Sequence, residues 1–557
     1  MPASTIVPGL PSPTQLAQGV ARIAPSELSK SPLLGILGVI IGAGIVTLTG
    51  RMITLGLADL KGHVGIGFDE GAWIGTAFNM ALIFIGPFTV YLGALVGQRK
   101  ILFFAAGVFT GICILLPFVH SYSLLVTAIV LAGLSSGTFY PLTLTFALRN
   151  IPLRFLPFTI ALYATFVDGA VNIAPSLYGW YRDHLSWHWM FWNSAVITPL
   201  MMICIYYGIP PVPAGKKASA PPSFAGFLYA SAGLALLLGA CEQGERLDWW
   251  RSGVFTSLFT GGSFLLLCAV FRRLRGPNPL VDVPYLRQWN TLVLGAGLFL
   301  FRFCLVATII LIPQSLAIHG FEADQIGPAL FWSAAPLLLV ALVAGLLLLA
   351  RVDSRLLLAS GFVFMALACY WNADLTTVWS ASNYYRTELL MGAGQAFAFI
   401  GLVSTIILQG IFSGGLSKPP WILTFSAFFH TVRIFGGNLG AVAMAHFVAQ
   451  QEKLHSNLLG LHVRTGDWIV DGNVRGLAAG LFSHSSGMAA AMGRAVGIVS
   501  VRLRLQAYTL SIIDGFYLVA WACVAALLLV ALLRTSPLNY SDLSILQQSS
   551  SALETKS

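Results

Sequence analysis

Few charged residues interrupt the long apolar stretches of this 557-residue chain. Asp168, Arg302 and Arg433 lie near the middle of such stretches, and Arg51 and Asp514 lie nearer to an end. An ionisable group inside a membrane helix costs about 2.5–3.5 kcal/mol on insertion scales, so each of these residues is expected to have a structural or functional role. A carboxylate at that depth can accept a proton from one side of a membrane and release it to the other. Asp168 is therefore the leading candidate for such chemistry.

Each of these charged residues also has a structural interpretation. Asp168 could form an ion pair with a buried arginine, and Arg302 could donate to a backbone carbonyl. Arg433 could be an interhelical hydrogen-bond donor that stabilises packing. Arg51 and Asp514 could reach the outer interface with their side chains and do no chemistry.

Neutral polar residues in the same stretches are weaker signals. Asn172, Gln314 and Gln395 could contact a bound solute, but such groups more often hold neighbouring helices together. With Arg302 and Arg51, they form the predicted substrate-binding set.

The composition excludes most soluble classes of protein. Apolar residues make up 57% of the chain and charged residues 9%, whereas soluble proteins carry about 25% charge. The net charge of +10 therefore indicates basic cytoplasmic loops rather than nucleic-acid binding. No HExxH, P-loop, GxSxG or metal-ligand spacing occurs, so no enzyme activity and no cofactor are predicted.

Long apolar stretches predict an all-α integral membrane protein with about 14 transmembrane helices. A spanning helix needs about 20 apolar residues, and stretches this long exclude a barrel. The predicted spans are residues 33–57, 72–95, 101–120, 123–147, 157–180, 188–209, 223–241, 253–271, 289–314, 326–349, 356–375, 388–412, 421–447 and 510–533.

Loop charges predict that both termini are cytoplasmic. With that orientation the short inner loops carry 13 Lys and Arg residues and the short outer loops carry 5, as the positive-inside rule requires. The predicted parts are a cytoplasmic tail (1–32), a six-helix bundle (33–209), a cytoplasmic linker (210–222), two extra helices (223–271), a second six-helix bundle (272–534) and a cytoplasmic tail (535–557). Within the second bundle, residues 448–508 form a periplasmic segment, in which 477–481 and 488–501 are expected to lie as short surface helices over the mouth.

Several local motifs occur in an order that is typical of one family. These are the motif Ser-Trp-His-Trp-Met-Phe-Trp-Asn at 186–193, the spacing Arg433, Gly436, Gly437 and Gly440, and Asp514-Gly515-Phe516 at the last span. The chain resembles the 14-span drug:proton antiporter branch of the major facilitator superfamily, the EmrB/QacA type, from about residue 40 to 535. The resemblance implies the major facilitator fold, and it implies that spans 7 and 8 are the extra pair.

The gating loop of the superfamily aligns after the second span and is only partly kept. Gly97, Arg99 and Lys100 match its glycine and basic pair, but Ala94 stands at the acidic position. That acid normally helps to latch the inner gate, so its loss is expected to loosen the latch.

Other motifs of the family are altered as well. Ile129 and Ala132 replace the Arg and Gln of the span 4 motif, and Thr49 aligns with the acid expected in span 1. Pro175 and Gly179 keep part of the antiporter motif in span 5. The resemblance then implies that proton coupling has moved to Asp168 and Arg433, and we place Asp514 with them.

These observations predict a secondary active efflux transporter for drug-like or amphipathic small molecules, using proton antiport and alternating access. One alternative is an exporter of a specific organic anion, and another is a non-transporting membrane protein on a degenerate transporter scaffold. The expected partners are a small-molecule substrate, a proton and the lipid bilayer, and no nucleic acid. By analogy with the family, a periplasmic adaptor and an outer-membrane channel are further partners if the source is a double-membraned bacterium, where the chain would lie in the inner membrane.

Overall fold

The structure is a computed structural model that describes residues 31–139, 156–209, 224–275, 286–412, 419–464 and 466–533. Nearly all of the two predicted cytoplasmic tails and of the linker 210–222 lies outside the described residues. The same holds for part of the predicted inner-loop charge, namely Arg149, Arg154, Lys216, Lys217 and Lys418.

Helices make up nearly all of the described chain, which confirms the predicted all-α membrane architecture. Thirteen described segments, some built from two successive helices, are long and apolar enough to cross a bilayer. The described part of the predicted span 123–147 is a shorter apolar helix. The α-helices are α2 (Pro32–Leu55), α3 (Leu57–Val64), α4 (Phe68–Val96), α5 (Gln98–Leu115), α6 (Tyr122–Ser136), α8 (Leu156–His184), α9 (Trp189–Gly208), α10 (Phe224–Gly244), α11 (Gly253–Arg275), α13 (Trp289–Cys304), α14 (Ile312–Ala317), α15 (Ala323–Ala334), α16 (Leu337–Leu349), α17 (Ser354–Asn372), α18 (Tyr385–Phe412), α19 (Pro419–Gly460), α20 (Trp468–Leu481) and α21 (Met488–Ala531).

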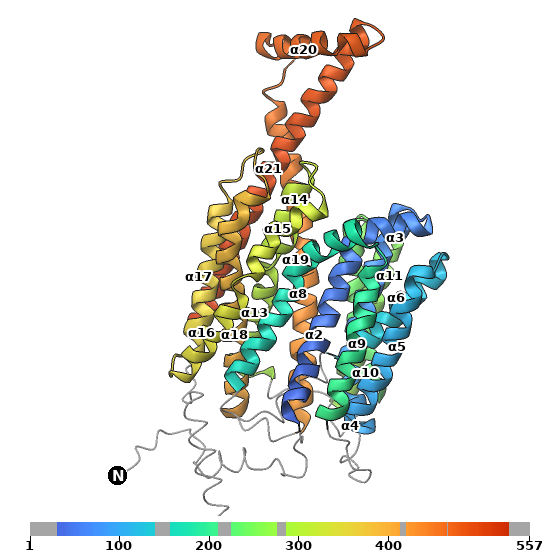
Figure 1. Cartoon of the computed structure of the whole chain (residues 1–557), viewed down its shortest axis with the longest axis vertical. Coiled ribbons are helices and arrows are strands. Elements are labelled where there is room, and N and C mark those ends of the chain that lie inside the picture. Colours follow the sequence, from blue (N-terminus) through green and yellow to red (C-terminus); the bar gives the residue numbers. More distant parts are fainter. Residues whose placement is uncertain are drawn as a thin grey trace, which may run out of the picture.

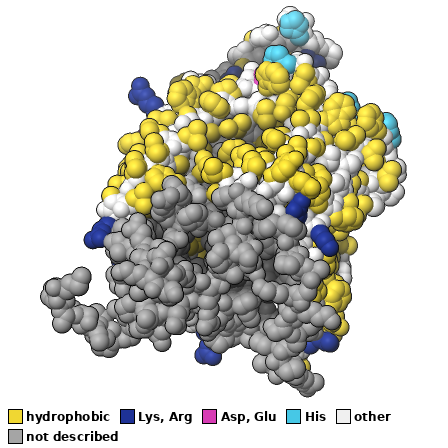
Figure 2. All heavy atoms as spheres, turned by 60° about the horizontal axis from the view of Figure 1, so that its bottom comes forward, with side chains coloured by type: hydrophobic (Ala, Val, Ile, Leu, Met, Phe, Trp, Pro, Cys, Tyr) yellow, Lys and Arg dark blue, Asp and Glu magenta, His cyan; other side chains and the backbone are white. Residues whose placement is uncertain are grey.

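Hydrophobic side chains cover the visible flanks of the bundle, with few charged residues among them (Figure 2). Leu338 and Leu339 of α16, for example, are each 67% exposed. Exposure of apolar surface to water is unfavourable by about 25 cal/mol per Å². In the hydrocarbon core of a bilayer this cost disappears, so the flank of the bundle is suited to lipid.

Two groups of helices lie side by side in the bundle (Figure 1). The N-terminal half consists of α2, α4, α5, α6, α8 and α9, and the C-terminal half consists of α13 to α19 and α21. The halves meet where α8 packs against α15, α16 and α18, and where α4 packs against α19. The pair α10 and α11 lies beside them, with α10 in contact with both α4 and α19.

The first and last described helices define one end of the bundle. There α2 begins, and Trp289 at the start of α13 donates from Nε1 to the Leu532 carbonyl just after α21 (3.1 Å). We call this end the terminal face and the opposite end the hairpin face. The cytoplasmic placement of the terminal face stays a prediction.

A pair of long helices projects from the hairpin face (Figure 1). α19 has 42 residues and α21 has 44, and α20 lies across their far ends. Arg504 of α21 donates from Nε to Glu452 of α19 (3.2 Å). Ala478 of α20 packs with Ala491 and Ala495 of α21 in a small separate hydrophobic cluster.

This projection differs from the short surface helices predicted over the mouth. The predicted helix 488–501 is the first part of α21, because no proline interrupts the chain between Met488 and Ala531. α19 likewise continues to Gly460 instead of ending at the membrane. Only the segment 477–481 belongs to a short helix, α20, and it stands away from the bundle (Figure 1).

Candidate functional site

A chain of hydrogen bonds crosses the contact between the two halves. Asn172 of α8 donates from Nδ2 to Gln395 Oε1 of α18 (3.1 Å), and Gln395 donates from Nε2 to the Thr308 hydroxyl (3.0 Å). All three side chains are buried. Thr308 belongs to a π-helical turn, Ala307–Leu311, which connects α13 to α14. The structure therefore brings together two predicted substrate-binding residues and adds a third polar group.

Asp168 lies one helical turn before Asn172 on the same face of α8. Its side chain is 2% exposed, and neither carboxylate oxygen has a hydrogen-bond partner among the described residues. Arg302 and Arg433 are close enough to act on the carboxylate electrostatically. A carboxylate buried at the contact between the halves, without a fixed hydrogen bond, is a candidate for exchanging a proton or a cation.

The glycines of the predicted small-residue face on α19 receive α13 and Arg302. A Cβ atom on Gly437 would lie 2.9 Å from a guanidinium nitrogen of Arg302, and one on Gly436 would lie 3.3 Å from Phe299 Cα. Small residues at such positions let two membrane helices approach closely. Arg433, one turn before Gly437, is 5% exposed. Arg433 is therefore buried and Arg302 half-buried at the contact of α13 with α19, near Asp168.

Arg51 connects the two halves nearer to the hairpin face. It lies on α2 and donates from Nη2 to the Ile309 carbonyl in the π-helical turn (2.9 Å). In a regular α-helix that carbonyl would accept from the residue four positions later. That residue is Pro313, which has no N–H. Arg51 therefore supplies a donor to a carbonyl whose α-helical donor position is occupied by proline.

Two further predicted residues occupy different surroundings. Gln314 lies on α14, where its Oε1 is buried and has no hydrogen-bond partner within the described chain. Asp514 pairs instead with His455 of α19 (2.7 Å), and its side chain is 36% exposed. The partner of Asp514 is thus a residue at the base of the projecting helices, and not Asp168 or Arg433.

Glu388 is a buried carboxylate that sequence reasoning missed. It is the first residue of the predicted span 388–412, where a charged side chain is expected to reach water. In the structure a helical turn, Ala381–Tyr384, precedes α18, and the Glu388 side chain is 0% exposed. The exposed Arg386 nearby suggested a helix end, so no sequence signal pointed to burial.

Pro175 and Gly179 lie where α8 packs against α15. A Cβ atom on Gly179 would lie 2.7 Å from Asp324 Cα, and one on Gly327 would lie 2.6 Å from Ser176 Cα. Real Cβ atoms essentially never come so close to another atom. The antiporter motif therefore supplies a close backbone contact between the two halves toward the hairpin face.

The predicted gating loop forms a tight turn at the terminal face. Gly97 joins α4 to α5 with φ of +102°, a conformation that glycine adopts most easily. The Arg99 guanidinium lies 4.3 Å from the centre of the Tyr206 ring of α9, and Lys100 is exposed. Arg99 is thus held within the N-terminal half.

Thr49, at the aligned acidic position of span 1, hydrogen bonds with Ser194 (2.8 Å) in the same half.

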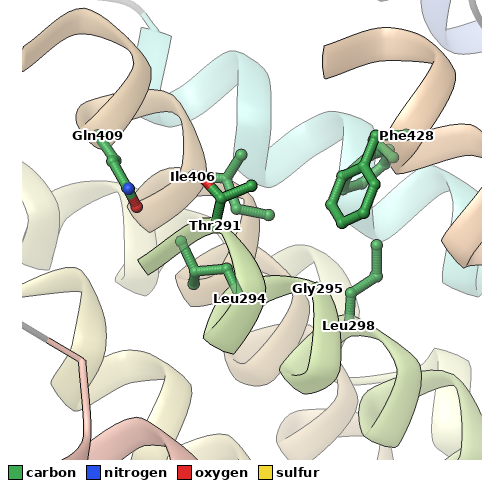
Figure 3. A pocket seen from close by; sticks show the side chains of 8 residues that line it. Thr291, Leu294, Gly295, Leu298, Ile406, Gln409 and Phe428 are labelled. Atoms are coloured by element: carbon green, nitrogen blue, oxygen red, sulfur yellow. The ribbon is translucent and has the colours of Figure 1, made fainter. Parts of the chain in front are cut away.

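A small cleft lies in the C-terminal half, between α13, α18 and α19 (Figure 3). Its lining residues are Thr291, Leu294, Gly295, Leu298, Ile406, Gln409, Phe428 and Phe429. Thr291 Oγ1 and Gln409 Oε1 are buried and lack a hydrogen-bond partner among the described residues. Both lie at the end of the cleft away from Phe428 (Figure 3). The cleft contains none of the predicted site residues.

A bundle of apolar helices in two halves, with buried polar and charged groups at their contact, is typical of membrane transporters. Comparison with known proteins supports the assignment as a membrane transporter. The chain belongs to the Major Facilitator Superfamily, whose sequence profile matches residues 39–411. It is therefore a multi-pass membrane transporter of small molecules and not an enzyme, as predicted.

Distant relatives carry the names of export and resistance proteins. The chain is 24% identical to the fatty acid resistance protein FarB of Neisseria gonorrhoeae over 72% of this chain and 78% of that protein. It is 22% identical to the multidrug export protein EmrB of Escherichia coli K12 over 85% of this chain and 90% of that protein. An auto-inhibited peptide transporter of the POT family shares the fold, with 15% identity, a TM-score of 0.52 and coverage of 91% and 99%.

Proposed function

We propose that this transporter exports drug-like or amphipathic small molecules in exchange for protons. The observation that carries the proposal is the buried Asp168 carboxylate, which lies beside Asn172 and within electrostatic reach of two arginines at the contact of the halves. The names of the relatives, which include multidrug export, support the same substrate class.

The exchange requires that proton and substrate alternate at Asp168. When substrate enters between the halves, the O–H bond of the protonated Asp168 carboxyl breaks and the proton leaves to water. After the substrate has left on the other side, a proton from that side re-forms the O–H bond. Arg302 and Arg433 stabilise the carboxylate while it is charged, because opposite charges attract strongly in a medium of low dielectric constant.

An organic anion is the second candidate substrate. Two arginines act on the single carboxylate at this position, so the three groups together carry a net positive charge whether the carboxyl is ionised or protonated. The relative named for fatty acid resistance is consistent with an anionic amphiphile. Direct competition between anionic and cationic probes distinguishes these substrate classes.

We place the terminal face in the cytoplasm, since the loops predicted on that side carry more Lys and Arg. If the source is a double-membraned bacterium, the projecting helices then enter the periplasm. The exposed Trp468 and Ile469 of α20 are suited to contact an adaptor protein there. Under this proposal, deletion of 465–487 abolishes export in cells but not transport by the purified protein in vesicles.

Transport by the full-length protein in proteoliposomes tests the proposal. The probes are the lipophilic cation tetraphenylphosphonium and the anionic amphiphile decanoate, each with and without an imposed pH gradient. We expect the gradient to drive accumulation of at least one probe by the wild type but not by the Asp168→Asn variant. Asp374→Asn is the matched control, because Asp374 is exposed just after α17, and it is expected to retain transport. Equal accumulation with and without the gradient would refute proton antiport.

A further inference from the structure

Glu388 is a second buried carboxylate, in the C-terminal half, with no assigned role. Its side chain is 0% exposed. Neither carboxylate oxygen has a hydrogen-bond partner among the described residues. A buried polar group is normally hydrogen-bonded, so this carboxyl group needs an explanation that packing alone does not give.

The surroundings of Glu388 contain hydroxyl groups but no cation among the described groups that act on it. Thr308 of the π-helical turn and Ser333 of α15 are the polar neighbours. The titratable neighbours are Tyr384 and Cys369, and neither carries a positive charge. Asp168, in contrast, has two arginines within electrostatic reach. The two carboxylates of the interior therefore differ in how their negative charge would be compensated.

Without a compensating cation, a carboxyl group at this position is stable as the neutral acid. A charge taken out of water without a partner costs far more than a neutral polar group. Thr308 and Ser333 offer only neutral hydroxyl groups to a charged Glu388, and the Ser333 hydroxyl also donates to the Leu330 carbonyl (2.6 Å).

The π-helical turn joins Glu388 to the N-terminal half. Thr308 faces Glu388 and also accepts from Gln395 (3.0 Å). The next residue, Ile309, accepts from Arg51 of α2 (2.9 Å). Since Pro313 cannot supply the α-helical donor, Arg51 supplies one to this carbonyl from the other half. π-Helical turns are often found at functional sites. This one contacts Arg51 of the N-terminal half and Glu388 of the C-terminal half.

We propose that Glu388 is a second proton-exchange group of this transporter and that its protonation holds the Arg51–Ile309 contact closed. In the closed arrangement the carboxyl keeps its proton. When its O–H bond breaks, the electron pair stays on the carboxylate and the proton passes to water. The charged carboxylate then draws in water and the Thr308 hydroxyl, which shifts the π-helical turn and opens the contact with α2. This inference rests on the proposed proton coupling and adds a site to it.

Hydrogen–deuterium exchange of the full-length protein in lipid nanodiscs tests this inference without a substrate. For the wild type, exchange in peptides covering 305–318, corrected for the chemical rate, is expected to increase from mildly acidic to mildly alkaline pH. Glu388→Gln, which imitates the protonated acid, is expected to remove this increase and keep exchange low at both pH values. Glu388→Asp is expected to retain the pH dependence.

Glu242→Gln is the matched control, because Glu242 of α10 is another carboxylate inside the bundle but accepts from Asn79 (3.0 Å). It is expected to behave like the wild type. The inference is overturned if Glu388→Gln keeps the pH dependence or if the wild type shows none. The proteoliposome experiment is independent of this readout: gradient-driven transport with an unchanged Glu388→Gln exchange pattern would retain the proposed function and remove only the second site.

Discussion

The Asn172 side chain on α8 and the Gln395 side chain on α18 are joined by a hydrogen bond of 3.1 Å across the contact between the two halves. Because these helices belong to different halves, the bond must break if the halves separate there during alternating access. The same Gln395 amide donates to Thr308, so one side chain serves both the contact and the π-helical turn.

A double-mutant cycle at this bond is expected to show direct coupling. Asn172→Ala and Gln395→Ala each remove one partner, and the double variant removes both. Interhelical hydrogen bonds in membranes contribute about 0.6 kcal/mol on average, so the free energies of unfolding should be non-additive by about that amount. Unfolding in mixed micelles measures all four proteins. Additive effects would show that the bond is absent in the membrane.

Addition of a methyl group at Gly179 is expected to destabilise the contact between α8 and α15. The new Cβ atom would lie 2.7 Å from Asp324 Cα, and overpacking of this kind costs about 1–3 kcal/mol. Thermal unfolding of Gly179→Ala should show a lower Tm. Gly472→Ala on α20 is the control, since nothing lies within 4 Å of its Cβ position and alanine favours a helix. A Tm that is the same or higher for Gly179→Ala would contradict the close contact.

Loss of the Arg51 donor is expected to be rescued by restoring a backbone donor. Arg51→Met removes the Arg51 donor from the Ile309 carbonyl, and loss of the partner of a buried polar group costs about 1–3 kcal/mol. Pro313→Ala supplies the missing N–H, so the loss of stability in Arg51→Met should be smaller in a Pro313→Ala background. Unfolding of the two single variants and the double variant provides the comparison. An equal loss in both backgrounds would mean that Arg51 acts through another contact.

Acid pH is expected to destabilise the cluster in which His63 of α3 packs against the rings of His120 and His188. Burial lowers the pKa of His63, and charge on His120 and His188 lowers it further. The unfolded state therefore binds more protons than the folded state, so the free energy of unfolding falls as the pH decreases below about 6.5.

His63→Phe removes this titration and retains a ring beside His120, whose centre lies 4.6 Å away. Its Tm is expected to depend less on pH than that of the wild type over the acidic range. His462→Phe, exposed on the projecting helices, is the control and should follow the wild type. Parallel curves for all three proteins would exclude a contribution from His63.

The sequence predicted the membrane architecture and the central polar residues because both depend on composition and depth. Apolar stretches define the spans, and polar residues at mid-span, such as Asp168, Asn172 and Gln395, are costly enough to be conspicuous. The glycines beside Arg433 also predicted a close helix contact, which α13 makes. The ordered motifs supported the superfamily, which the profile match then confirmed.

Other features depend on contacts between distant segments and could not be predicted. Pro313 is visible in the sequence, but its effect on the Ile309 carbonyl matters only because Arg51 lies beside it. Glu388 lies at a predicted helix end, and only packing against other helices shows its burial. The projection of α19 and α21 was missed because hydropathy marks where an apolar stretch ends, whereas a helix continues until a residue or a cap terminates it.

Proton release from the purified protein in weakly buffered detergent solution tests the central claim most directly. Tetraphenylphosphonium or decanoate is added to the wild type, to Asp168→Asn and to the control Asp374→Asn, and the pH change and binding are recorded together. The account predicts proton release by the wild type and by Asp374→Asn on binding of one probe, and none by Asp168→Asn. Binding with no release by the wild type, or with equal release by Asp168→Asn, would contradict the assignment of Asp168 as the proton-coupling group.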